Sequence, residues 1–231
     1  MQRSQWFIFN KKQILGAVGL LIFLGSLAAA GFMFMFKQRP QLSGEELWST
    51  ALDRTRACKT YRYQVEVLYN GKTNMRGEGE RVFPDRVHLT GSMANTKLEF
   101  IQIGEKGFMK DPYTKQWIKL EGNQLSQSEL FITELNPLGM FNFKDIPQIK
   151  NLGKVKDKEQ EYVELLLQPN LANPFMENFI NFEYHIRISP DDYLIKQADI
   201  SALSKGHEQV KFNLRLKFSD YDKDITINPP L

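Results

Sequence analysis

The sequence predicts an α+β protein built on one large, curved antiparallel sheet of about ten strands. Three observations support this prediction. First, most of residues 60–218 falls into strand-length segments in which apolar and polar residues alternate. Second, turn signals such as Asn70-Gly71 separate these segments. Third, only two or three segments show helical spacing. Alternation gives each strand one apolar face, and the few helices are the elements that would cover that face.

The N-terminal region contains an uncharged, apolar run of 23 residues, Ile14–Phe36. As a helix this run would be about 35 Å long, enough to cross the apolar core of a bilayer. The sequence therefore predicts four parts: a short cytoplasmic arm at 1–13, a single-pass transmembrane helix or signal anchor at 14–36, a linker at 37–43, and an extracytoplasmic domain at 44–231.

A cleaved secretory signal is the alternative, because Ala28-Ala29-Ala30 offers small residues of the kind found at cleavage sites. Against cleavage there, the apolar run continues through Phe32–Phe36. Both interpretations carry the following domain across the membrane. Cys58 is the single cysteine, so no internal disulfide can form, and export without disulfides fits a bacterial cell-envelope protein better than an animal secreted module.

The positive net charge belongs to the N-terminal arm. Residues 1–40 hold five Lys or Arg and no acidic residue, whereas residues 41–231 hold 25 Lys or Arg against 27 Asp or Glu, a net charge of −2. No basic tract interleaved with aromatic residues is present. Nucleic acid is therefore excluded as an expected partner.

The first element of the domain is an amphipathic helix at 45–58. Ser43 and Glu46 form the S-x-x-E capping pattern that opens a helix. Apolar or small residues then recur at helical spacing: Leu47, Trp48, Ala51, Leu52 and Thr55.

The strands follow in order, beginning with "YRYQVEVLY" at 61–69, which alternates strictly and ends at the hairpin signal Asn70-Gly71. Asp111-Pro112-Tyr113-Thr114 has the composition of a tight bend between two short strands. The remaining strands are expected at 75–83, 86–91, 98–103, 108–110, 116–120, 149–156, 161–168, 182–188, 193–204 and 210–218. Between them we expect a helix at 127–135, an aromatic loop or short helix at 141–146, and an insertion with a short helix at 169–180.

No residue pattern predicts catalysis or metal binding. His88, His185 and His207 lack a His or Cys at metal-ligand spacing, and the paired carboxylates fall at a helix start, a turn and a strand end. Nucleophile-elbow, zinc-protease and phosphate-loop motifs are absent from the sequence. The sequence therefore predicts a non-enzyme with no catalytic residue, no metal and no cofactor, and an enzyme remains a minority alternative.

Three segments resemble the LolA-like family, which includes LolA lipoprotein carriers, lipid-binding lipoproteins of the LppX/LprG kind and the RseB stress sensor: "GEGERVFPDRVHL", "IGEKGFMKDPYTKQWIKL" and the ending "LRLKFSDYDKDITINPP". The resemblance covers about residues 42–230. It implies an open, unclosed barrel, with helices on the concave side of the sheet and an apolar cavity that receives acyl chains or a lipidated partner. Family lipoproteins carry a lipidated cysteine where Leu27-Ala28-Ala29-Ala30 stands here, so the 14–36 helix would be the anchor.

The expected function is a membrane-tethered extracytoplasmic domain that binds a lipid or an acylated protein in a hydrophobic cavity. The predicted cavity residues lie on the apolar faces of the strands: Val65, Val67, Leu98, Phe100, Trp117, Phe182, Tyr184, Ile186, Val210, Phe212, Leu214 and Leu216. Two alternatives remain. The domain's own side chains could fill this face as an ordinary core, or the domain could sense stress or assist assembly by binding a neighbouring envelope protein.

Overall fold

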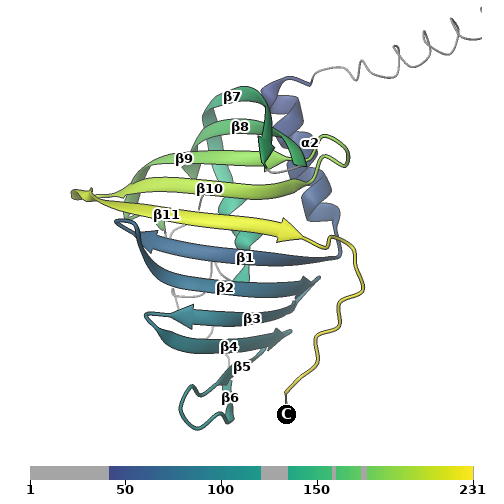
Figure 1. The fold of residues 1–231 in the computed structure, drawn as a ribbon, viewed down its shortest axis with the longest axis vertical. Helices are drawn as coiled ribbons and strands as arrows, with labels where there is room; N and C mark the ends of the chain where they lie inside the picture. The colour runs from purple at the N-terminus through teal and green to yellow at the C-terminus, as the bar shows by residue number, and fades with distance from the viewer. Residues whose placement is uncertain (1–41, 121–134, 158–159, 173–175, 231) are drawn as a thin grey trace, which may run out of the picture. The chain divides into compact units, whose positions relative to one another are not determined.

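The computed structural model describes residues 42–120, 135–157, 160–172 and 176–230. Within them, eleven strands form one antiparallel sheet with the order β6-β5-β4-β3-β2-β1-β11-β10-β9-β8-β7 (Figure 1). The strands are β1 (Thr60–Tyr69), β2 (Lys72–Val82), β3 (Arg86–Met93), β4 (Thr96–Ile103), β5 (Lys106–Lys110), β6 (Trp117–Leu120), β7 (Phe143–Asp157), β8 (Gln160–Leu171), β9 (Phe179–Ile188), β10 (Ile195–Ser204) and β11 (His207–Ser219). The predicted single antiparallel sheet is confirmed, with eleven strands in place of about ten.

The sheet is open rather than closed. Strands that follow one another along the chain pair as neighbours, and the pair β1–β11 joins the two halves, with Val65 opposite Leu216. Strands β6 and β7 lie at the two ends of the strand order. The sheet curls between these two edges (Figure 1).

The two faces of the sheet differ sharply in polarity. We call the face that carries Tyr63, Val65 and Leu216 the inner face, and the face that carries Gln64 and Glu66 the outer face. Directly opposed residues on neighbouring antiparallel strands share a face. Buried and exposed residues alternate along β1, and buried apolar residues alternate with more exposed ones along β9, as the sequence pattern predicts.

Glycines on the inner face allow unusually close packing between strands. Gly79 lies opposite Tyr63, and a Cβ atom at Gly79 would lie 2.1 Å from Cζ of the Tyr63 ring. On β3, a Cβ atom at Gly91 would lie 2.3 Å from the carbonyl oxygen of Arg76. Real Cβ atoms do not approach other atoms so closely, so a larger residue at Gly79 would displace the Tyr63 ring, and one at Gly91 would displace the backbone of β2.

Helix α2 (Gly44–Ala57) packs against the inner face beside β7 and β10. Its start is a capping box: the Glu46 backbone N–H donates to Ser43 Oγ at 3.2 Å, and the Ser43 N–H donates to Glu46 Oε2 at 2.9 Å. At its other end, Thr55 Oγ1 accepts from the Ile195 N–H at 3.1 Å. The predicted helix is confirmed, and its buried residues are Leu47, Trp48, Ala51 and Thr55.

A short 3₁₀ helix, η2 (Pro137–Phe141), lies against the inner face, where Phe141 meets the rings of Tyr184 and Phe218. Leu138, Met140 and Phe141 are buried, and Tyr184 Oη on β9 donates to the Met140 carbonyl at 3.1 Å. The aromatic loop or short helix expected at 141–146 is therefore divided: Phe141 ends η2 and Phe143 begins β7.

Beyond Tyr221, the C-terminal segment after β11 lies against the outer face. Ile225 and Ile227 pack with Ile101 and Phe108 in a small apolar cluster, against which Val82, Ile103 and Trp117 are also packed. Polar bonds hold the segment along its length. Thr60 Oγ1 donates to the Lys223 carbonyl at 2.7 Å, and Arg86 donates to the Ile227 carbonyl at 2.9 Å.

Several sequence predictions fall wholly or partly on residues that the structure does not describe, among them the arm at 1–13, most of the linker at 37–43 and residues 173–175 of the expected insertion. The predicted membrane helix at 14–36 lies wholly outside the described residues, and the predicted helix at 127–135 does so except for Leu135. Among the helices that are described, none has both the length and the apolar character needed to cross a membrane.

Candidate lipid-binding face

The inner face gathers most of the predicted cavity residues. Strand alternation places β1, β9 and β11 side chains on this face, and pairings such as Val67 with Leu214 align them across the sheet. Nine of the twelve predicted residues are buried: Val65, Val67, Phe100, Phe182, Tyr184, Ile186, Phe212, Leu214 and Leu216. Leu98 and Val210 follow the alternation of their strands but are only half-buried.

Trp117 lies elsewhere. It pairs with Lys110 across β5 and β6 and therefore shares a face with Phe108, which belongs to the cluster under the C-terminal segment. The Lys110 ammonium lies 5.3 Å from the centre of the Trp117 ring. Trp117 thus contributes to the outer face, and its placement differs from the sequence prediction.

Aromatic side chains from separate elements meet above the inner face. The Trp48 ring of α2 stacks on the Phe143 ring, with 5.6 Å between the ring centroids, and meets the Phe141 ring edge-on, with 5.7 Å between the centroids. Phe143 in turn meets Tyr184 at 5.1 Å. Burial raises the pKa of the Tyr184 phenol above its usual range, which is consistent with an apolar surrounding. Part of the inner face is therefore filled by the chain's own side chains.

Two polar residues on the inner face were not among the predicted site residues. Arg81 lies directly opposite Tyr61 across β1 and β2. Tyr61 is fully buried, and its hydroxyl has no partner among the described residues. Arg81 donates through one terminal nitrogen to the Leu135 carbonyl at 2.9 Å, while its Nε has no described partner. The available signal was the inward register of Arg81, two residues after Gly79 on β2.

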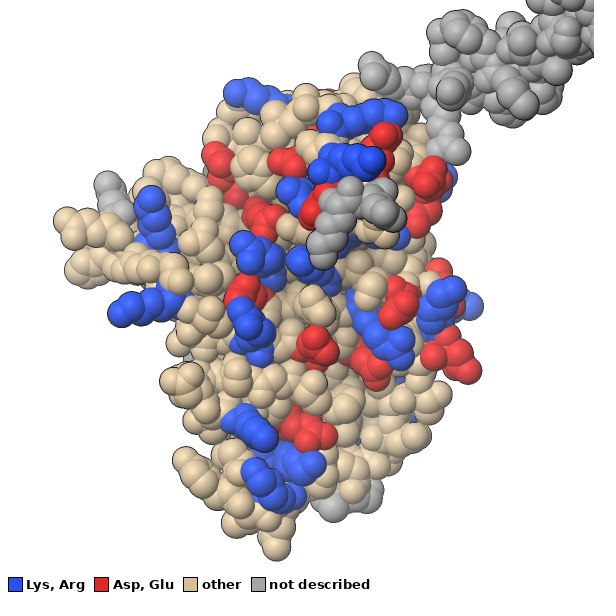
Figure 2. Space-filling view, viewed as in Figure 1, with Lys and Arg blue, Asp and Glu red and all other residues tan. Residues whose placement is uncertain are grey.

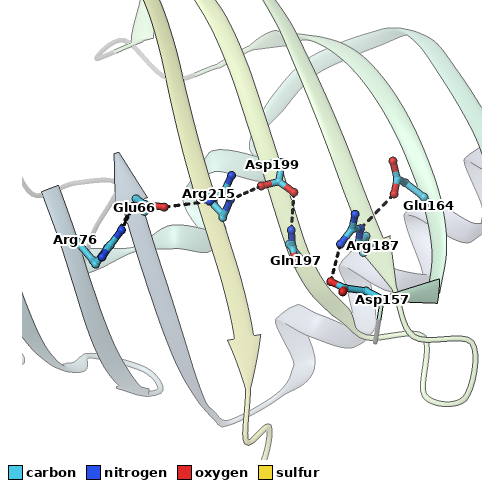
Figure 3. A network of polar contacts seen from close by, with 8 residues as sticks. All are labelled: Glu66, Arg76, Asp157, Glu164, Arg187, Gln197, Asp199 and Arg215. Atoms are coloured by element: carbon cyan, nitrogen blue, oxygen red, sulfur yellow. Dashed lines mark hydrogen bonds and ion pairs between the residues drawn. The ribbon is translucent and has the colours of Figure 1, made fainter. Parts of the chain in front are cut away.

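The outer face is covered by interspersed acidic and basic side chains (Figure 2). Figure 3 shows one chain of contacts across four strands: Glu66 binds Arg76 and accepts from Arg215 at 3.1 Å, and Arg215 donates to Asp199 at 2.9 Å. The hydrogen bond from Arg76 is the main reason that the pKa of Glu66 lies below its usual value. Asp199 also accepts from Gln197 at 2.5 Å.

A second set of outer-face contacts links β7, β8 and β9. Arg187 pairs with Asp157 at 3.1 Å and with Glu164 at 3.2 Å (Figure 3). His185 lies between Glu164 at 2.9 Å and Glu183 at 3.2 Å. Burial alone would lower the pKa of His185, but hydrogen bonds to the two carboxylates outweigh it and raise the pKa. Partly exposed networks of this kind are typical of a solvated sheet face.

A groove of about 1340 Å³ also lies on the outer face. Its lining includes Lys217 on β11 and the two residues directly opposite it, Gln64 on β1 and Gln197 on β10. Acidic residues such as Asp157 and Asp191 complete much of the lining. Such a polar lining does not suit an acyl chain.

Within the described ranges, no group of three or more His, Cys, Asp or Glu side chains is arranged to hold a metal ion. Cys58 is buried, its Sγ lies 3.3 Å from the Arg54 carbonyl, and burial raises the pKa of its thiol to about 11. A thiol of that pKa is largely protonated at neutral pH and is a poor nucleophile.

No family model matches the sequence, and no curated protein matches it significantly. Solved structures do match the fold. The lipoprotein LppX of Mycobacterium tuberculosis aligns with a TM-score of 0.57 at 14% identity, covering 79% of this chain and 96% of its own. LprF of Mycobacterium bovis aligns with a TM-score of 0.57 at 10% identity, covering 81% and 96%. A LolA superfamily protein of Nitrosomonas europaea aligns with a TM-score of only 0.34 at 9% identity, covering 80% of this chain and 96% of its own. The likeness to LppX and LprF confirms the LolA-like, LppX/LprG-like fold that the sequence resemblance implies.

Proposed function

We propose that this protein binds a lipid or a lipidated protein against the inner face of its sheet, outside the cytoplasm of a bacterial cell. The observation that carries the proposal is the inner face itself: an apolar surface that continues from β4 through β1 and β11 to β8 on a curled, open sheet. The fold shared with LppX and LprF, and the LolA-like resemblance of the sequence, favour the same function.

Desolvation supplies the binding free energy. Each methylene group transferred from water to an apolar surface contributes about 0.8 kcal/mol, so a sixteen-carbon chain would contribute on the order of 10 kcal/mol before entropic costs. The ligand must enter beside α2 and η2, which contact the same face. Binding of this kind needs no catalytic group.

We propose in addition that residues 14–36 tether the domain to the membrane as a single span, with 1–13 in the cytoplasm. The uncharged run of 23 residues supports this arrangement. A fixed anchor favours local handling of lipid or lipoprotein over diffusion between membranes.

Native mass spectrometry of the full chain, released from detergent in the gas phase, tests the proposed function. We expect a protein carrying one lipid or acylated peptide, identified by the mass difference after dissociation. A stoichiometric protein partner with no lipid would favour the alternative role in stress sensing or assembly. A chain without any lipid that also fails to take up palmitate after delipidation would overturn the proposal.

A further inference from the structure

Arg81 on β2 places a positive charge on the inner face, directly opposite the buried Tyr61 of β1. The two residues are directly opposed in the β1–β2 register, so their side chains leave the sheet on the same side. The Arg81 guanidinium carbon lies 4.9 Å from the centre of the Phe83 ring. Charge and hydroxyl are therefore held side by side against aromatic surface.

The Tyr61 hydroxyl is a free hydrogen-bond donor in an apolar setting. Tyr61 is fully buried, and its ring contacts four other aromatic rings at centroid distances of 5.7 to 6.0 Å: those of Tyr63, Phe83, Phe218 and Tyr221. No described residue accepts a hydrogen bond from its Oη. Burial raises the pKa of this phenol above its usual range, so the group is protonated and able to donate. Buried hydroxyls nearly always have a partner, so one without a described partner calls for an explanation.

Arg81 is likewise incompletely bonded. Its guanidinium is always charged, and among the described residues no carboxylate pairs with it. On the outer face, by contrast, four arginines pair with carboxylates: Arg62, Arg76, Arg187 and Arg215. One terminal nitrogen of Arg81 binds the Leu135 carbonyl, and the buried Nε–H remains without a described acceptor. A partly buried cation without an anion destabilises a protein unless another group compensates it.

We propose that Arg81 and Tyr61 form the binding site for the anionic group of the ligand, so that the protein selects an acyl chain that ends in a carboxylate or a phosphate. This inference rests on the proposed function, because the chain must lie on the inner face for its headgroup to reach this pair. The anion accepts hydrogen bonds from Arg81 Nε and Tyr61 Oη and neutralises the guanidinium. The acyl chain extends from there over the apolar side chains of β1 and β11, such as Val65 and Leu216.

The test compares an acid with its neutral ester, using the full chain in amphipol and cis-parinaric acid and its methyl ester as fluorescent probes. We expect the wild-type protein to bind the acid at least about tenfold more tightly than the ester. Arg81→Met should weaken binding of the acid about tenfold or more and leave the ester within twofold, and Tyr61→Phe should weaken the acid about threefold or more. Arg62→Met, which removes a guanidinium from the outer face, is the matched control and should change neither the affinity for the acid nor that for the ester.

The outcomes separate this inference from the proposed function. If the wild-type protein binds neither probe, the proposed function itself fails. If it binds acid and ester equally, or if Arg81→Met weakens both equally, the anion site is wrong while the lipid-binding face stands. Thermal unfolding of the ligand-free protein tests whether the role of Arg81 is merely structural. We expect Arg81→Met to unfold at the wild-type temperature or above it. A clearly lower unfolding temperature would show that Arg81 serves to hold Leu135 in place and would overturn the site.

Competition then distinguishes the two headgroups. Palmitate and hexadecyl phosphate each displace bound parinaric acid from the wild-type protein if they occupy the site, and the tighter competitor identifies the preferred anion. Failure of both to compete, while methyl palmitate competes, would overturn the assignment of an anionic ligand.

Discussion

At the scale of single residues, packing and polarity depend on positions that a periodic pattern does not mark. Gly79 is needed because the Tyr63 ring lies where a side chain would begin. Arg81 continues the inward register of β2 but carries a charge, so alternation alone gives no sign that it belongs to the ligand face. The buried residues of β1 and β11, by contrast, could be predicted individually, because strict alternation over nine or more residues fixes which side chains share a face.

His185 gives a pH-dependent prediction at this scale. Its pKa is raised in the folded protein by hydrogen bonds to Glu164 and Glu183, which outweigh the effect of burial. A raised pKa means that the folded state binds the proton more tightly than the unfolded state. The resulting stabilisation is therefore fully present below the ordinary pKa of 6.5 and is lost as the pH rises through the folded-state pKa.

The measurement is urea unfolding at a series of pH values from below to above 6.5, with His185→Gln as the comparison. We expect the wild-type free energy of unfolding to exceed that of the variant at the acidic end and the difference to shrink as the pH rises. The effect should be small, because the His185 side chain is 38% exposed and solvent screens the pair. A difference that grows towards alkaline pH would contradict the assigned direction.

At the scale of elements, regular segments were predictable and irregular ones were not. Helix α2 was marked by its capping box and helical spacing, and it begins within one residue of the expected position. Strand β7 is longer than the 149–156 expected, because register shifts interrupt its pairing with β8 and break the alternation that a sequence pattern needs. Trp117 was placed on the wrong face because β6 has only four residues, too few to fix a face by alternation.

The C-terminal segment is an element without any repeating structure, and its two isoleucines cover part of the outer face. Ile227 is 3% exposed and packs in the cluster with Ile101 and Phe108. We expect Ile227→Ala to lower the free energy of unfolding by about 2 kcal/mol or more, because it removes apolar contacts and leaves a void. Chemical denaturation gives this value directly.

Ile118→Ala is the control, since Ile118 is 44% exposed. The same truncation there should lower the free energy of unfolding by well under half of the loss expected for Ile227→Ala. Equal losses at the two positions would show that the C-terminal segment does not hold Ile227 against the outer face in solution.

At the scale of the whole molecule, the sequence was sufficient for the fold class, the single open sheet and the identity of most inner-face residues. It was not sufficient to say how far the inner face is filled, because that depends on where non-periodic segments lie. Residues 137–141 lie against the inner face at β9, where the Tyr184 hydroxyl binds their backbone. No spacing of residues in the sequence indicates that contact. The charged outer face, which several ion pairs link across the strands, leaves the inner face as the surface suited to an acyl chain.

Photocrosslinking tests most directly whether an acyl chain lies on the inner face. A sixteen-carbon fatty acid with a diazirine near its terminal methyl group would be bound to the delipidated full chain, irradiated, and mapped by peptide mass spectrometry. We predict one saturable adduct per chain, on inner-face residues such as Val65, Tyr184 or Leu214, and its loss with excess palmitate. Adducts confined to outer-face residues such as Gln64 or Lys217, or none that palmitate displaces, would contradict the account.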